Sequence, residues 1–574
     1  MAKKESNQDI ERRINIVLLF FLLAVLALVS RLFTLQILNH QDYVKLASRQ
    51  HRVLGDEASE RGTIYATEKS GNLVPLALNR IQKNLVASPK SIQDIDTASS
   101  VIAEIFGIKK EEILEKISNR GDQYEVILKD VASEKAEKTA TNLPDGFFFE
   151  EEQKRAVPSK ELVAHVLGFA SKEDFEEVGR YGLERYYNRE LSGEKGFFEG
   201  VKDGAGFFVS LGRRITSPPK NGSDLVLTVD YNIQLKAADI LSGVVDKWKP
   251  ASGSVLVIDP KTGKILAQQS SPTFDPNEYF KETDFSVYQN PFVEFIYELG
   301  SVIKPITLAS AVNEGLVNAE TTYEDRGEVK FGGYTIKNFD GKAYHVQTMT
   351  QVLEKSLNTG AVYVSRRLGK ERHYEYLKRF GFGETANIDL PGEVEGDLSN
   401  LNVRRDIDFA TASFGQGIAV TPLQMALAMG VIANGGKLMR PFVVEKIIDG
   451  SGNERKIEPQ TVREVISKET AETVTKMLVS AVRSGFENKA GVKGYFVAGK
   501  TGTAQIPNRD RPGYSDKVIH TFVGYAPAFD PRFLIYIQIN EPIGNRFAAN
   551  TLTPAFHDLA EYILNYYEVP PDER

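Results

Sequence analysis

The sequence of 574 residues contains no cysteine. Without thiols the protein cannot form a disulfide, use a cysteine nucleophile or hold a metal through thiolates. Its seven histidines are scattered, and no two of them have the His-x-x-x-His or His-Glu-x-x-His spacing of a zinc site. We therefore expect a function that depends on neither a metal nor a cofactor.

The chain also lacks any dense run of lysine and arginine, and its formal net charge is −7. Proteins that bind nucleic acid usually carry a basic patch that matches the phosphates, so we expect no nucleic-acid partner. A chain of this length should fold into more than one domain and can bury a large core.

Only one long hydrophobic run occurs, and it lies near the N-terminus. The polar segment 1–13 carries four basic residues, and the run that follows extends over 14–38 with a single charge at Arg31. A bilayer core of about 30 Å needs about 20 helical residues, so 14–38 suffices if the Arg31 side chain reaches the outer headgroups. The basic start predicts that 1–13 stays in the cytoplasm and that the rest of the chain is exported.

Two other interpretations of this run remain open. A cleaved signal peptide also begins with basic residues followed by an apolar stretch. We favour an uncleaved single-pass anchor in the cell membrane, because the run is longer than a usual signal core and no clean Ala-x-Ala precedes a polar start. A buried core helix is a third interpretation, which the lack of a polar face disfavours.

The segment Tyr297–Ile306 carries the strongest chemical signal. Pro305 has no N–H and fits a first helical turn, which predicts a helix that begins near Ser301 and runs to Gly315. Ser301 and Lys304 are three apart and would share one face of that helix. A hydroxyl and an amine at the start of an apolar helix indicate a nucleophile with its base. A capping serine beside a surface lysine is the alternative.

Two further motifs follow in the chain, Ser356-Leu-Asn358 and Lys500-Thr-Gly502. A Ser-x-x-Lys, a Ser-x-Asn and a Lys-Thr-Gly motif in this order are typical of β-lactamases and penicillin-binding proteins. The sequence resembles the class B penicillin-binding proteins, which are peptidoglycan D,D-transpeptidases. The resemblance extends from Arg31 to the C-terminus and includes three further segments, which start at Arg61-Gly-Thr-Ile, Gly182-Leu-Glu and Ser413-Phe-Gly-Gln-Gly.

This resemblance implies an α+β protein with a single N-terminal transmembrane helix over 14–38, an elongated pedestal domain over 39–217 and a transpeptidase domain over 218–574. The alternation of apolar residues predicts strands that come from both ends of the last domain, at 254–267 and beyond residue 496. As the family implies it, these strands form one antiparallel sheet flanked by helices, around an all-helical subdomain that contains Ser301.

The resemblance also implies the roles of the motif residues. Ser301 is the nucleophile and Lys304 its base, and burial beside the charge of Lys500 would lower the pKa of Lys304 far enough for it to accept a proton. Ser356 relays that proton to the leaving D-alanine, and Asn358 holds the substrate amide.

By the same resemblance, the residues of the third motif bind the substrate. Thr501 and Thr503 offer hydroxyls to the substrate carboxylate, to which Lys500 adds its charge, and Gly502 lets an extended substrate lie close to the edge of the sheet. By resemblance, the backbone N–H groups of Ser301 and Thr503 form the oxyanion hole.

The implied reaction cross-links peptidoglycan stem peptides that end in D-Ala-D-Ala, with release of D-alanine, and β-lactam antibiotics should inhibit it covalently. The chain lacks the Glu-Asp-x-x-Phe-x-x-His signature of a glycosyltransferase. We therefore expect a membrane-embedded glycosyltransferase and division proteins as partners. Its length and the segment 413–424 favour division, whereas an elongation-specific transpeptidase and a catalytically idle wall-synthesis scaffold remain alternatives.

Overall fold

The computed structural model describes residues 18, 22–23, 25–34, 59–173, 176–199, 214–331, 333–485, 488–508, 511 and 513–572. Twelve of the 25 residues of the predicted anchor over 14–38 lie outside these residues, although 25–33 are helical. Within the described residues no helix is both long and apolar enough to span a bilayer. The anchor therefore stays a prediction.

The chain divides into two compact units. One consists of residues 1–59 and 194–220, and in it β7 (Phe197–Glu199) pairs with β8 (Arg214–Ser217). The other consists of residues 60–193 and 221–574 and contains all three motifs.

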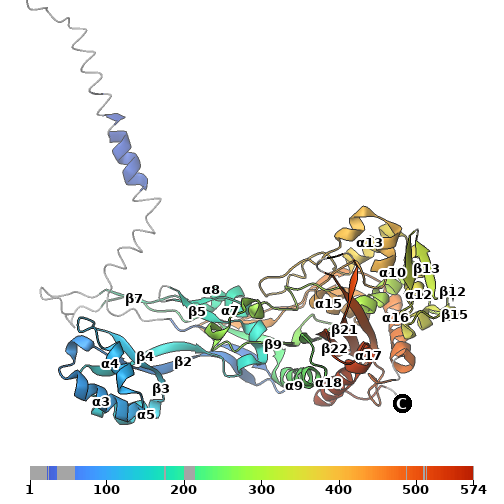
Figure 1. Ribbon diagram of the computed structural model, residues 1–574. Coiled ribbons are helices and arrows are strands. Elements are labelled where there is room, and N and C mark those ends of the chain that lie inside the picture. The colour runs from blue at the N-terminus through green and yellow to red at the C-terminus, as the bar shows by residue number, and fades with distance from the viewer. Residues whose placement is uncertain are drawn as a thin grey trace, which may run out of the picture. The chain divides into compact units, whose positions relative to one another are not determined.

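The larger unit contains a five-stranded antiparallel sheet with the order β11-β10-β22-β21-β20. Two of its strands, β21 and β22, are labelled in Figure 1 beside α15 (Pro422–Ala433). Its strands are β10 (Ser252–Ile258), β11 (Ile265–Ser271), β20 (Ala498–Pro507), β21 (Tyr514–Ala526) and β22 (Phe533–Asn540). Strand β22 is apolar along nearly its whole length and is buried, as expected of a strand covered on both faces. The predicted sheet from two distant parts of the chain is confirmed, because β10 pairs with β22.

Helices surround this sheet. The strands contact α9 (Tyr231–Trp248), α15 (Pro422–Ala433), α16 (Lys468–Ser480) and α18 (Thr553–Tyr566). Further helices between β11 and β20 are α10 (Lys304–Asn313), α11 (Met349–Glu354), α12 (Asn358–Leu368), α13 (Lys370–Arg379) and α14 (Asp406–Ala412).

The expectation of an all-helical subdomain around Ser301 is wrong, because this region also holds short strand pairs. These are β12 (Thr322–Asp325) with β15 (His345–Thr348), β13 (Glu328–Phe331) with β14 (Tyr334–Lys337), and β16 (Lys437–Met439) with β19 (Thr461–Glu464). For β13 and β14 the cause of strand formation is local. Apolar and polar residues alternate on both sides of Gly332-Gly333, and this pattern is typical of a β-hairpin.

A second sheet has the order β18-β17-β9-β1-β2-β3, with β4 also paired to β2. Its strands are β1 (Ile64–Thr67), β2 (Leu73–Ala87), β3 (Glu125–Val131), β4 (Phe147–Ala156), β9 (Asp224–Asp230), β17 (Val444–Ile448) and β18 (Glu454–Lys456). Strand β9 lies between β1, to which it is parallel, and β17. The sheet thus combines residues from both sides of the boundary predicted at 217, and the domain limits stay a prediction.

A buried ion cluster holds the pedestal segments together. Glu184 in α7 (Gly182–Tyr186) is 1% exposed, and its two carboxylate oxygens accept hydrogen bonds from Arg61 Nε at 2.6 Å and Arg155 Nε at 2.7 Å. Burial alone would raise the pKa of Glu184, but the two guanidinium groups outweigh it and lower that pKa.

Candidate active site

The three sequence motifs meet in one cleft of about 1000 Å³. Its walls come from the turn that carries Ser301, the turn before α12 and the edge strand β20, and they include Ser356, Asn358, Thr501 and Thr503. Residues more than 190 positions apart in the sequence are therefore neighbours in space.

Ser301 lies in the short 3-10 helix η8 (Gly300–Ile303), and α10 continues from Lys304 with Pro305 in its first turn, as the sequence predicts. The segment around Gly415 holds this turn in place. Gly300 N donates a hydrogen bond to Gly415 O at 3.1 Å, and a Cβ at Gly415, whose φ is +83°, would come within 2.2 Å of Gly300 O. The two backbones can approach this closely only because Gly415 has no side chain.

Lys304 is fully buried beside the second motif. Its Nζ donates to Asn358 Oδ1 at 2.8 Å, to Ser356 Oγ at 3.3 Å and to the Ser356 carbonyl. Burial, helped by the positive charge of Lys500, holds the pKa of Lys304 well below its usual range. A lowered pKa favours the neutral amine, and a neutral amine can accept the proton of a serine hydroxyl.

Ser356 occupies the turn between α11 and α12 with a φ of +54°. Its Oγ accepts hydrogen bonds from Lys500 Nζ at 3.0 Å and from Lys304 Nζ at 3.3 Å. A hydroxyl between two amines can pass a proton from one side to the other. The expectation that a turn directs Ser356 and Asn358 to the same cleft agrees with this geometry.

Lys500 is fully buried in β20, and this burial lowers the pKa of Lys500 to about 7. Thr501 and Thr503 follow on the same strand and line the cleft. Because β20 is the last strand of its sheet, its outer edge can pair with an extended peptide.

Gly502 has a structural explanation that differs from the predicted one. A Cβ at this position would come within 2.6 Å of Leu299 O and 3.1 Å of Val302 Cγ1. The missing side chain therefore lets η8 pack against β20, which places Ser301 beside the third motif.

Sequence reasoning missed two contacts at the cleft. Tyr514 in β21 donates a hydrogen bond to Glu298 Oε2 at 2.9 Å, just before the Ser301 turn. Phe339 and Phe547 both line the cleft, remain about half exposed and meet edge to face with ring centroids 5.4 Å apart. No sequence signal pairs these residues, because more than 200 positions separate the members of each pair.

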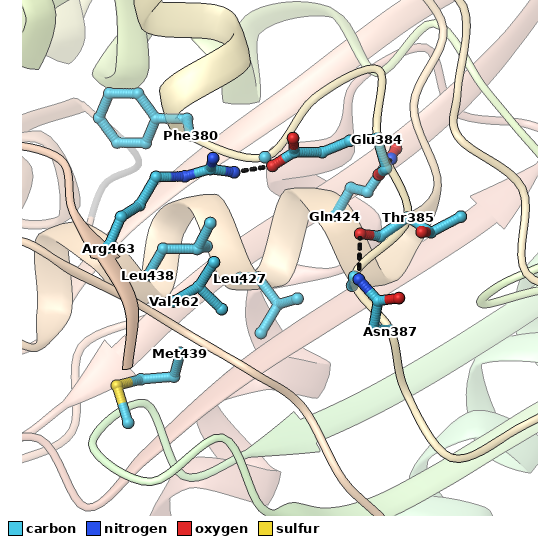
Figure 2. Close-up of a pocket in the computed structure, with 12 residues that line it drawn as sticks. Phe380, Glu384, Thr385, Asn387, Gln424, Leu427, Leu438, Met439, Val462 and Arg463 are labelled. Carbon is cyan, nitrogen blue, oxygen red and sulfur yellow. Dashed lines mark hydrogen bonds and ion pairs between the residues drawn. The ribbon is translucent and has the colours of Figure 1, made fainter. Parts of the chain in front are cut away.

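Another pocket of about 220 Å³ lies between α15, β16 and β19 and contains no motif residue (Figure 2). Two polar contacts lie within it, an ion pair between Arg463 and Glu384 and a hydrogen bond from Asn387 Nδ2 to Thr385 O. Nor do the described residues contain a cluster of three acidic or histidine side chains that could hold a metal. The motif cleft is therefore the candidate site.

Comparison with known proteins identifies the family. A family model described as "Penicillin binding protein transpeptidase domain" matches residues 253–561, and one described as "Penicillin-binding Protein dimerisation domain" matches residues 56–227. The chain belongs to the class B penicillin-binding proteins. The predicted resemblance is thus confirmed, and the fold is the transpeptidase fold of this family with its dimerisation domain, of α+β class.

The chain also aligns with individual members of this family over most of their length. The chain is 32% identical over 573 residues to stage V sporulation protein D of Bacillus subtilis, covering 99% of this chain and 87% of that protein. It is 30% identical to the probable peptidoglycan D,D-transpeptidase PenA of Neisseria meningitidis, with coverage of 97% and 93%. The structure of penicillin-binding protein 3 from Mycobacterium tuberculosis, complexed with aztreonam, matches with 26% identity, a TM-score of 0.70 and coverage of 90% and 98%.

Proposed function

We propose that this penicillin-binding protein is a peptidoglycan D,D-transpeptidase that cross-links stem peptides during septal wall synthesis. The observation that carries the proposal is the pair of buried lysines that hold Ser356 between them in the cleft that Ser301 also lines. A scaffold without catalytic activity would gain nothing from burying two amines in this way, because burial of an ionisable group costs free energy.

In the first step Ser301 Oγ attacks the carbonyl carbon of the penultimate D-alanine, while Lys304 takes the hydroxyl proton. The C–N bond to the last residue breaks, and Ser356 passes the proton from Lys304 to the departing nitrogen, so that D-alanine leaves with a neutral amine and its carboxylate. The product is an ester between Ser301 and the stem peptide.

In the second step an amine from a neighbouring strand attacks this ester. Its proton moves to Lys304 and from there to Ser301 Oγ, which restores the free hydroxyl and completes the cross-link. The N–H groups of Ser301 and Thr503 stabilise the negative oxygen in both steps, where the loss of one such donor typically costs about 3 kcal/mol.

Binding of the donor peptide depends on β20. The charge of Lys500 and the hydroxyls of Thr501 and Thr503 receive the terminal carboxylate, and Asn358 holds the substrate amide. A β-lactam presents an equivalent acyl carbonyl to Ser301, in keeping with the aztreonam complex of the Mycobacterium tuberculosis relative.

The protein would act at the outer face of the cell membrane, anchored by 14–38 with its N-terminus in the cytoplasm. Since this sequence has no glycosyltransferase signature, it would work with a membrane-embedded glycosyltransferase and with division proteins. Fluorescence microscopy of a tagged, complementing copy tests this role: signal at the septum supports it, and signal along the side wall favours the elongation alternative.

The first prediction concerns the covalent bond. After incubation with benzylpenicillin, mass spectrometry of the full chain should find one adduct, on the peptide that contains Ser301. Ser301→Ala should abolish the adduct, whereas Ser451→Ala, in an exposed turn, should leave it unchanged. A folded wild-type protein that takes up no benzylpenicillin would refute the proposal and favour an idle scaffold.

A further inference from the structure

A buried carboxylate that the mechanism does not use lies directly behind the second motif. Asp325, at the end of β12, is 0% exposed. Its oxygens accept hydrogen bonds from Thr359 Oγ1 at 2.7 Å, Asn338 Nδ2 at 2.9 Å, Tyr344 N at 2.9 Å and Gly327 N at 3.0 Å. Every one of these partners is a donor, so the site suits a carboxylate, which only accepts.

Two of the four partners lead to Asn358. Thr359 directly follows Asn358, and its N–H and Oγ1 both lie within hydrogen-bonding distance of Asn338 Oδ1, at 3.3 and 3.1 Å. Lys337 directly precedes Asn338, and its carbonyl accepts a hydrogen bond from Asn358 Nδ2 at 2.9 Å. Asp325 thus binds the side chains of Asn338 and Thr359, the two residues next in sequence to the Lys337–Asn358 contact.

That contact decides which end of the Asn358 amide faces the base. Because Nδ2 donates to the Lys337 carbonyl, Oδ1 is left to accept the hydrogen bond from Lys304 Nζ at 2.8 Å. If Lys337 moved, the amide could turn. Its NH₂ group would then either oppose the N–H groups of Lys304 or donate to the lone pair with which a neutral Lys304 takes the Ser301 proton.

We propose that Asp325 is a positioning residue for the acylation step. Through Asn338 and Thr359 it holds Asn358 in the orientation in which the amide oxygen keeps the Lys304 amine beside Ser356. This inference rests on the proposed function, since it assigns Asp325 to the same reaction without any contact to substrate. The alternative is that Asp325 only ties down the chain between β12 and β15.

The test compares Asp325→Asn with wild type in acylation by benzylpenicillin. The substitution keeps the size of the side chain but turns an acceptor into a donor that faces donors. We expect the first-order acylation rate constant to fall about 10- to 100-fold, which is the loss typical of a catalytic group displaced by about 1 Å. The dissociation constant of the noncovalent benzylpenicillin complex that precedes acylation should change little. Wild-type kinetics in Asp325→Asn would overturn the inference.

Asp389→Asn is the matched control. Asp389 is also buried, at 5% exposure, and accepts hydrogen bonds from Val443 N at 2.7 Å, Val444 N at 2.9 Å and Tyr187 Oη at 3.1 Å. This variant should lose stability in the same way, yet the folded protein should be acylated at the wild-type rate. An equal kinetic loss in both variants would mean that Asp325 is merely structural.

Two double variants separate positioning from general support. Exchange of the two groups, Asp325→Asn with Asn338→Asp, restores a carboxylate–amide pair and should recover most of the lost rate. In the Asn358→Ala background Asp325→Asn should cost little more, because its effect passes through Asn358. The inference would also be overturned if Asp325→Asn lowered the acylation rate as much in the Asn358→Ala background as in wild type. The same holds if the exchanged pair recovered the melting temperature but not the acylation rate. If the proposed function itself fails, wild type is not acylated at all.

Discussion

Lys304 and Lys500 are both fully buried, and burial favours the neutral amine in each. The proposed chemistry needs them in opposite states. Lys304 must be neutral to take the Ser301 proton, and Lys500 must be charged to attract the substrate carboxylate. Burial, with the charge of Lys500, holds the pKa of Lys304 well below its usual range, and burial lowers that of Lys500 to about 7, so the proposed chemistry requires the pKa of Lys304 to be the lower of the two.

The pH dependence of acylation follows from these two pKa values. As the pH rises through the pKa of Lys304 the base becomes neutral and the rate should increase; above about pH 7 Lys500 loses its charge and the rate should decrease. Measurement of the second-order acylation rate constant of the free enzyme from about pH 5 to about pH 10 should therefore give a bell-shaped profile.

The variant Lys500→Arg tests the assignment of the basic limb. Arginine stays charged throughout this range, so the decrease above neutral pH should disappear while the acid limb remains. Lys304→Arg, which cannot serve as a base, should instead lower acylation by orders of magnitude at every pH. A basic limb that persists in Lys500→Arg would show that another group causes it.

At the scale of elements, the packing of η8 against β20 brings the first and third motifs together. Gly502→Ala should disturb this packing, because the new Cβ would meet the Leu299 carbonyl at 2.6 Å and a backbone atom cannot move aside easily. We expect a loss of about 1–3 kcal/mol in the free energy of unfolding, and a larger proportional loss of acylation. Denaturant unfolding and penicillin binding would measure the two effects.

Gly243→Ala provides the control for this substitution. Gly243 lies in α9, and a Cβ there would meet nothing within 4 Å. Alanine also favours a helix over glycine, so this variant should be neutral or more stable. If Gly502→Ala behaved like Gly243→Ala, the close approach of η8 to β20 would not be what positions Ser301.

At the scale of the whole molecule, β9 joins the pedestal segments to the catalytic part. Leu225 and Val226 pair with Ile64 and Tyr65 of β1, and Leu225 N donates to Thr63 O at 2.9 Å. On the other side β9 pairs with β17, close to the segment that Asp389 binds. A chain that begins at residue 218 keeps all three motifs but leaves one edge of β9 without its partner.

Truncation tests this connection. A chain of residues 59–574 should unfold like the full chain and be acylated at the same rate, because β1 and β9 both remain. A chain of residues 218–574 should unfold at a temperature lower by roughly 5 °C or more, or aggregate through the bare edge of β9. Equal melting temperatures for the two chains would show that the pedestal segments add no stability.

The sequence by itself indicated the class of reaction and the class of fold, through three motifs whose order is typical of penicillin-binding proteins. Ser301, Lys304, Ser356, Asn358 and Lys500 were recognisable because each motif is local and its spacing is set by a helical turn, a tight turn or a strand. The strands and helices of the central sheet were recognisable for the same reason, since periodicity of apolar residues is a local property.

Only the tertiary structure decided which distant segments meet. No sequence motif includes Asp325, and its proposed role becomes visible only when Asn338 and Thr359 are seen around it. Gly502 is explained by Leu299, and β9 is placed in the second sheet by β1 and β17. The physical reason is that strand pairing and the burial of polar groups depend on partners far along the chain, about which local propensity carries no information.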